Sequence, residues 1–115
     1  MRYNAKTREY FDRPVPPGEG KLRGEAGSVV QGARIVVTAD AENGKLSNLG
    51  FRAYACPHII AAAHRATELL AGQPVEAMTD IDIDLLRQEF EIPVEKAGKL
   101  LILKDAFSRC AAGSD

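Results

Sequence analysis

The chain has 115 residues, 45% of them hydrophobic and 27% charged, which fits one globular domain over residues 1–115 and excludes general disorder. The 15 basic and 16 acidic residues give a net charge of −1, so we expect no nucleic-acid partner, because such proteins usually carry a basic surplus. No apolar run is long enough to span a bilayer, and the N-terminal residues lack the apolar core of a signal peptide, so we expect a cytoplasmic protein without a membrane partner.

The first predicted element is a short helix over residues 4–11, for which Asn4 supplies the N-cap. Prolines at positions 14, 16 and 17 lack a donor N–H, so residues 14–18 cannot continue that helix. We expect this run to form a loop that leads the chain into the rest of the fold.

From residue 22 to residue 54 the apolar residues follow the two-residue period of strands. β-Branched residues are frequent over positions 34–38, and apolar residues alternate loosely over 46–54. Asn43-Gly44 between these runs is the typical sequence of a tight hairpin turn. Residues 24–30 are expected to add a third antiparallel strand.

The remaining sequence has helical patterning. Pro57 suits the first turn of a helix that runs to residue 70, and Gly72 suits its C-terminal stop. A capping-box-like start predicts a second helix over residues 79–90. A last helix is predicted from apolar side chains at spacings of three and four, namely Leu100, Leu103, Phe107 and Cys110. This order predicts an α+β fold, in which a small antiparallel three-stranded sheet is packed by helices on one face.

The two cysteines have different surroundings. Cys110 lies on the apolar stripe of the last helix, so we expect it to pack in the core. Cys56 stands at the N-cap position of the first long helix, where unpaired backbone N–H groups and the positive helix end favour a thiolate. With His58 two residues on, Cys56 is either a reactive or metal-binding thiol or a half-buried structural one. His64 is expected on a polar helix face, in contact with Glu68.

Several stretches of the chain follow the order and spacing of one known family. Residues 50–56, Gly-Phe-Arg-Ala-Tyr-Ala-Cys, are similar to the Phe-x-x-Tyr-Gly-Cys strand end of the IscU/NifU-type iron–sulfur cluster assembly scaffolds. Further similar stretches are residues 10–14, 27–33, 60–61, 67–72 and 91–96. The chain therefore resembles the NifU N-terminal-like scaffolds along nearly its whole length, and the resemblance implies a SufE/NifU-like fold.

The resemblance implies a scaffold, not an enzyme, on which iron and sulfide are assembled with a cysteine desulfurase and then handed on. Family members hold the cluster with three cysteines and an aspartate, because soft thiolates bind iron–sulfur clusters. Cys56 matches the second of these cysteines. Gln31 stands at the first cysteine position, Ala33 at the aspartate position, and Gly98-Lys99 at the position of a histidine–cysteine pair.

The resemblance also implies a partner-binding segment. Residues 91–96, which include Ile92, Pro93 and Lys96, match the segment that binds an Hsp70-type chaperone in the family. In this chain Val94 and Glu95 depart from the family's pattern.

The loss of ligands changes the expected chemistry. With one ligand of the family's four retained, we do not expect this chain alone to hold a family-style iron–sulfur cluster. If the fold brings Lys99 beside Cys56, its ammonium takes the electrostatic role of a metal and holds a thiolate.

Three hypotheses follow. The first is a scaffold-like protein that binds assembly partners and carries iron or zinc weakly through Cys56 and His58, or completes its site by pairing with a second chain as a homodimer. The second is a single-cysteine sulfur carrier that accepts a persulfide on Cys56. The third is a regulatory binding module that kept the fold and lost the chemistry.

Overall fold

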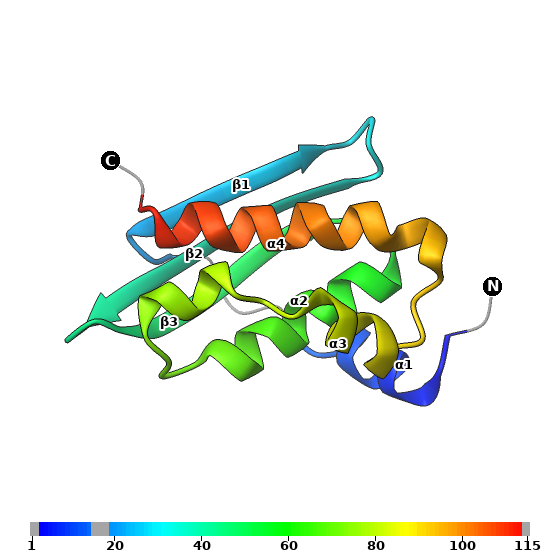
Figure 1. Cartoon of the computed structure of the whole chain (residues 1–115), viewed down its shortest axis with the longest axis horizontal. Coiled ribbons are helices and arrows are strands. Elements are labelled where there is room, and N and C mark those ends of the chain that lie inside the picture. The colour runs from blue at the N-terminus through cyan, green and yellow to red at the C-terminus, as the bar shows by residue number, and fades with distance from the viewer. Residues whose placement is uncertain (1–2, 15–18, 114–115) are drawn as a thin grey trace.

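A computed structural model, which describes residues 3–14 and 19–113, shows a three-stranded antiparallel sheet with its helices on one face (Figure 1). The elements follow in the order α1 (Ala5–Phe11), β1 (Leu22–Ser28), β2 (Ala33–Glu42), β3 (Lys45–Tyr54), α2 (Pro57–Leu70), η1 (Val75–Thr79), α3 (Ile83–Glu89), η2 (Val94–Lys96) and α4 (Ala97–Ala111). The predicted α+β class and three-stranded sheet are confirmed. None of the helices in the described ranges is long and apolar enough to cross a membrane.

The N-terminal helix forms as predicted. Asn4 lies in an extended backbone conformation, and its side-chain Oδ1 accepts a hydrogen bond of 2.8 Å from the backbone N–H of Thr7. This bond satisfies one of the N–H groups that a helix start leaves open. Most of the predicted loop over residues 14–18 lies outside the described residues.

The sheet has the order β1-β2-β3, and both connections are antiparallel. The predicted hairpin turn is confirmed: Asn43 and Gly44 have φ angles of 54° and 77°, as a two-residue turn between twisted strands requires. The strand predicted over 24–30 instead spans Leu22–Ser28, and residues 29–30 form a turn in which Val30 is 98% exposed. Pairing with its neighbours also extends β2 beyond the predicted run of β-branched residues, to Glu42.

Helix α2 has the predicted bounds, and Gly72 just after it has a φ of 77°, which suits a helix stop. The helix predicted over 79–90 is shorter in the structure. Val75–Thr79 forms a separate 3₁₀ turn, and α3 begins at Ile83, where Asp82 accepts a hydrogen bond from the backbone N–H of Leu85. Asp82 is the stronger N-cap because its carboxylate reaches that N–H.

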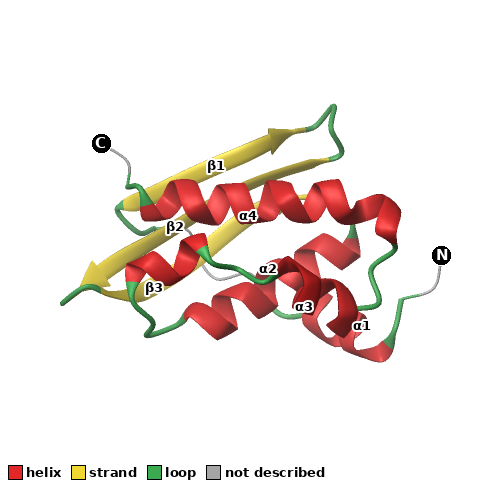
Figure 2. Cartoon of the chain, viewed as in Figure 1, coloured by secondary structure: helices red, strands yellow, loops and turns green. Residues whose placement is uncertain are grey.

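Helix α4 lies across the sheet on the same face as α2 (Figure 2). Its predicted apolar stripe is confirmed, with Leu100, Leu103, Phe107 and Cys110 buried in the core. The close approach depends on Gly24 of β1, where a Cβ atom would lie 2.1 Å from the backbone nitrogen of Cys110 and 2.2 Å from the carbonyl oxygen of Ala106. α4 begins beside the junction of β3 and α2, where its N-cap Lys96 contacts Cys56, and from there crosses the covered face of the sheet (Figure 2).

Candidate functional site

Cys56 lies between the end of β3 and the first turn of α2. It is the N-cap of α2, in an extended conformation, and its carbonyl accepts hydrogen bonds from the N–H groups of Ile59 and Ile60. Pro57 follows at the first helical position, where its missing N–H costs nothing. The thiol makes no capping hydrogen bond and is half-buried, so it is available to a partner from another element.

The partner of Cys56 is Lys96, the last residue of η2 and the N-cap of α4. Its Nζ lies 3.4 Å from Cys56 Sγ and 3.0 Å from His58 Nδ1. The sequence analysis assigned Lys96 to the partner-binding segment and considered Lys99 as an ammonium that the fold could bring beside Cys56. In the structure it is Lys96, three positions before Lys99, that contacts the thiol, whereas Lys99 Nζ lies near Gly32. The positive charge of the Lys96 ammonium therefore faces the sulfur of Cys56.

His58 is buried, with 1% of its surface exposed. Burial, and to a lesser degree the charge of Lys96, holds the pKa of His58 below its ordinary value, so the ring is neutral. Because the ammonium can only donate, Nδ1 is assigned as the acceptor and Nε2 carries the proton. The ring of Tyr3 packs edge-on against His58 at 4.6 Å between centroids, and Lys96 Nζ lies 5.6 Å from the centroid of the same tyrosine.

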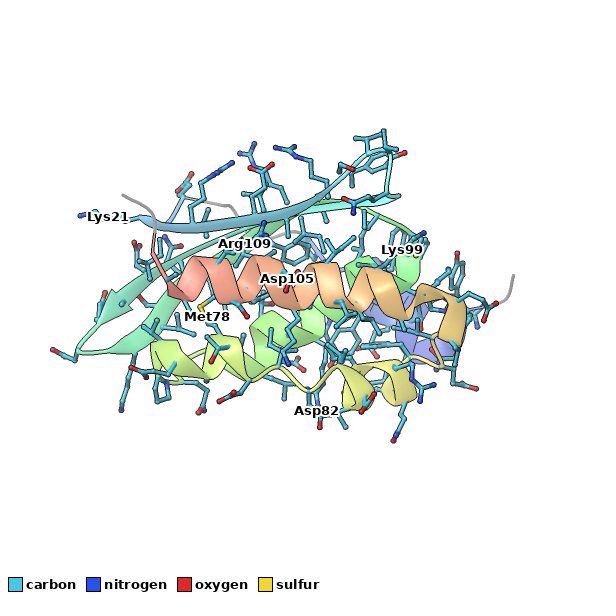
Figure 3. The ribbon with its side chains drawn as sticks, turned by 45° about the horizontal axis from the view of Figure 1, so that its top comes forward. Lys21, Met78, Asp82, Lys99, Asp105 and Arg109 are labelled. Carbon is cyan, nitrogen blue, oxygen red and sulfur yellow. The ribbon has the colours of Figure 1, made fainter. Side chains whose placement is uncertain are left out.

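The three positions that the resemblance matches to absent family ligands come together at the turn between β1 and β2. Gln31 is exposed in the turn between β1 and β2, where its backbone N–H and side-chain oxygen both bond to the Ser28 hydroxyl. Ala33 is fully buried at the start of β2. Lys99 extends from the beginning of α4 toward the turn between β1 and β2 (Figure 3). Its Nζ lies so close to Gly32 that a Cβ atom added to that glycine would be 3.2 Å away. None of these side chains offers a soft ligand to a metal.

The predicted partner-binding segment is partly inside the molecule. Ile92 is 2% exposed and belongs to the core, and Pro93 is half-buried. Val94, at 70% exposure, is the apolar side chain that this segment presents to solvent. Because the side chain of Ile92 is buried, a chaperone could not contact it in this conformation. That the segment binds a partner stays a prediction.

The donor set does not fit an iron–sulfur cluster. In residues 3–14 and 19–113, no three His, Cys, Asp or Glu side chains lie close enough together to share a metal ion. The space between Cys56 and His58 is taken by the Lys96 ammonium, which already supplies a positive charge there. Clusters are held mostly by thiolates, and one thiolate balanced by one ammonium leaves no net negative charge for iron.

The structure does not place His64 on a polar helix face, as the sequence analysis expected. It is 4% exposed, and its ring packs edge-on against Phe51 at 4.8 Å. Glu68 instead bonds to Tyr10, Arg13 and Arg65. At this point α2 is buried all round, since Ala61, Ala62 and Ala63 are also buried, so no solvent-facing side is left for the ring.

Comparisons with known proteins agree with this fold. The family model of the NifU-like N terminal domain matches residues 2–112 of the chain. A relative from Debaryomyces hansenii, "Iron sulfur cluster assembly protein 1, mitochondrial", is 25% identical over 112 residues, which cover 90% of this chain and 63% of that protein. The chain thus spans less than two thirds of the length of this relative.

Two solved structures have the same fold. The N-terminal part of a NifU-like protein from Brucella abortus matches with a TM-score of 0.70 at 14% identity, covering 95% of this chain and 91% of that one. A putative iron–sulfur cluster assembly scaffold protein for the SUF system from Fervidobacterium islandicum matches with a TM-score of 0.61 at 13% identity, covering 96% and 89%.

Proposed function

The chain belongs to the family of the NifU-like N-terminal domain, and on this basis we propose that it serves iron–sulfur cluster assembly as a non-enzymatic protein that carries sulfur on Cys56. It does not hold a cluster by itself. The observation that carries this proposal is the contact of one ammonium, Lys96 Nζ, with both Cys56 Sγ and His58 Nδ1.

This contact favours thiol chemistry over metal binding. A metal held by Cys56 and His58 has to displace an ammonium that is already paired with both, and it then gains only two protein ligands. A thiolate or a persulfide anion at Cys56 gains instead from the charge of Lys96. The geometry therefore supports sulfur carriage more strongly than weak iron or zinc binding.

The sulfur source that fits is a cysteine desulfurase in its persulfide form. The Cys56 thiolate attacks the outer sulfur of the donor persulfide, which forms an S–S bond at Cys56. The S–S bond of the donor breaks, and the donor cysteine leaves as a thiolate. The step moves one sulfur atom without any further oxidant, and the Lys96 ammonium stabilises the anion at Cys56 both before and after transfer.

Partner binding is part of the same proposal. The residues that follow the Lys96 segment and those just before it also expose apolar side chains, with Val94 at 70% and Leu101 at 52% exposure. Such side chains on a monomer suit contact with other proteins. A desulfurase that delivers sulfur, an Hsp70-type chaperone at the Val94 segment and a second copy of this chain are the partners that we propose for it.

The experiment is sulfur transfer followed by intact mass. The protein is mixed without oxygen with a cysteine desulfurase and cysteine, and the mass gained per chain is measured. We expect the mass of one sulfur atom, lost in Cys56→Ser and retained in Cys110→Ala. Cys110 is the matched control because it is fully buried, and burial raises the pKa of its thiol to about 11.

A second variant tests the role of Lys96. Lys96→Met removes the ammonium while keeping an unbranched side chain only one atom shorter, so sulfur transfer at neutral pH should slow by about tenfold. Lys99→Met is the matched control at the next helical turn and should transfer at the rate of the unchanged chain. Transfer that persists in Cys56→Ser contradicts the proposal.

A further inference from the structure

The face of the sheet that the helices leave uncovered contains a cleft of about 560 Å³. Three arginines from three different strands line it, together with Thr38, Tyr54 and Glu19. The volume lies in the range of sites for small molecules, which span about 300–1,000 Å³. The cleft is separate from Cys56 and Lys96, neither of which lines it.

The strand register fixes where the arginines stand. Arg23 of β1 is opposite Thr38, Arg52 of β3 is opposite Val36, and Arg34 of β2 is opposite Tyr54. Because side chains two residues apart share a face, Arg34, Val36 and Thr38 line up along β2 on the open side. The guanidinium groups therefore surround a small apolar centre at Val36.

Two of the arginines are held in place by one carboxylate. Glu25 lies opposite Val36 on β1 and takes a hydrogen bond of 2.9 Å from Arg23 Nη2 and one of 2.7 Å from Arg34 Nε. These bonds hold the pKa of Glu25 below its ordinary value, Arg34 being the larger cause. A guanidinium has five N–H donors, so both arginines keep donors for a ligand.

The third arginine has no such partner. Within the described parts of the chain, Arg52 makes no ion pair or side-chain hydrogen bond, and it faces Val36 across the strand pair. The cleft thus has two arginines oriented by Glu25 and one, Arg52, whose side-chain donors are unpaired among residues 3–14 and 19–113. Glu19 at the rim and Glu25 reduce the positive charge but do not cancel the three guanidinium groups.

Two further side chains of the cleft, Thr38 and Tyr54, suit a ligand that carries polar groups and a flat ring. Thr38 is 7% exposed, and its hydroxyl makes no hydrogen bond among the residues that the structure describes. Tyr54 is 57% exposed beside Arg34, so its ring face is open to stacking. Aromatic faces bind nucleobases by stacking without regard to sequence.

We propose that this cleft binds a nucleoside phosphate, with its phosphate groups on Arg23, Arg34 and Arg52 and its base on Tyr54. Arginine suits this role because its planar fork matches phosphate oxygens. The site is independent of the sulfur chemistry at Cys56.

Titration calorimetry with ATP in metal-free buffer tests the proposal, with pyrophosphate as the probe that lacks a base. Arg52→Gln should weaken ATP binding by about tenfold or more, because hydrogen bonds to charged groups are among the strong ones. Tyr54→Ala should weaken ATP binding and leave pyrophosphate binding unchanged. Added salt should weaken binding of both ligands.

Arg8→Gln is the matched control, since it removes the same charge from the exposed side of α1, away from the cleft. Cys56→Ser should bind ATP as the unchanged chain does, which separates this proposal from sulfur carriage. Absence of ATP binding, or ATP binding that Arg52→Gln does not weaken, overturns the proposal. Equal binding of ATP and pyrophosphate that Tyr54→Ala does not alter overturns the assignment of a nucleoside.

Discussion

Lys96 places a positive charge at the cysteine site. One side chain from the start of α4 reaches both Cys56 and His58, which lie 40 and 38 positions away in the sequence. The position of Cys56 at a helix start was readable from sequence, since a strand pattern ends at Tyr54 and Pro57 opens a helix. The identity of its partner was not, because neither helical nor strand periodicity relates residues so far apart.

His64 shows a second limit of the sequence at the level of a single residue. Helical spacing relates His64 to Ile60 and Glu68, which suggested that His64 lies on the polar face of α2. In the structure, the buried part of α2 is wider than its predicted apolar stripe and includes His64. The imidazole therefore enters the core with Nε2 unpaired among the described residues. Such a nitrogen is a cost to stability, because it gives up water without gaining a partner.

Both buried histidines should make the fold sensitive to mild acid. Burial lowers the pKa of His58 and of His64, with smaller effects from Lys96 and Arg13. The unfolded chain takes up protons near the ordinary pKa of about 6.5 while the folded chain does not, so stability falls as pH drops below that value. In His64→Leu, the free energy of unfolding should therefore decrease less between about pH 7 and pH 5 than in the unchanged chain.

Urea unfolding at several pH values measures this effect. His64→Leu removes the proton uptake of one of the two histidines, so its unfolding midpoint should change less over that interval than the midpoint of the unchanged chain. An identical pH dependence in the two proteins would mean that His64 is protonated equally in the folded and unfolded states.

At the level of the elements, α1 is tied to the helical layer by charge as well as by packing. Glu68 of α2 accepts hydrogen bonds from Tyr10 at 2.7 Å and Arg13 at 2.9 Å, and it also pairs with Arg65. Lys6 of α1 pairs with Glu89 of α3. The helices themselves were predictable from caps and apolar spacing, but these ties were not, since exposed charges on separate helices carry no pattern along the chain.

Loss of the Glu68 charge should loosen α1. Hydrogen bonds from Tyr10, and next from Arg13, lower the pKa of Glu68 to about 2. Glu68 is 41% exposed, so solvent weakens these contacts, and we expect Glu68→Gln to lower the free energy of unfolding by about 1 kcal/mol at pH 7. Because the lowered pKa gives stability above the ordinary value, the difference should shrink as pH falls from about 4.5 toward 2.

Chemical denaturation of Glu68→Gln beside Glu42→Gln checks this. Glu42 is exposed at the end of the β2–β3 hairpin, so its variant removes the same charge away from α1 and should unfold as the unchanged chain does. Equal stability of the two variants at pH 7 would show that Glu68 does not hold α1.

At the scale of the whole molecule, the sheet separates the two sites for which we propose functions. Its covered face supports the core, its open face holds the arginine cleft, and Cys56, just after β3, contacts Lys96 at the junction of η2 and α4. The α+β class followed from the order of strand and helix patterns. The open face was missed because Arg34, Val36 and Thr38 read as one alternating strand, and only the three-strand register brings Arg23 and Arg52 beside it.

The resemblance matches Gln31 and Ala33 to two ligand positions of the family, and the structure shows which charge lies beside the cysteine that matches a third. Gln31 lies in the exposed turn between β1 and β2, where it accepts a hydrogen bond from Ser28, and Ala33 is buried in the core. The positive charge of Lys96 lies beside Cys56. The site is therefore built around one thiol and one ammonium.

The most direct measurement loads the protein without oxygen with a cysteine desulfurase, cysteine and ferrous iron, separates it from small molecules, and determines both iron and sulfane sulfur per chain. We predict about one sulfane sulfur on Cys56 and no stoichiometric iron, since one thiolate paired with an ammonium cannot replace a set of thiolate ligands. Stoichiometric iron, with visible cluster absorbance that disappears in Cys56→Ser, would contradict the account.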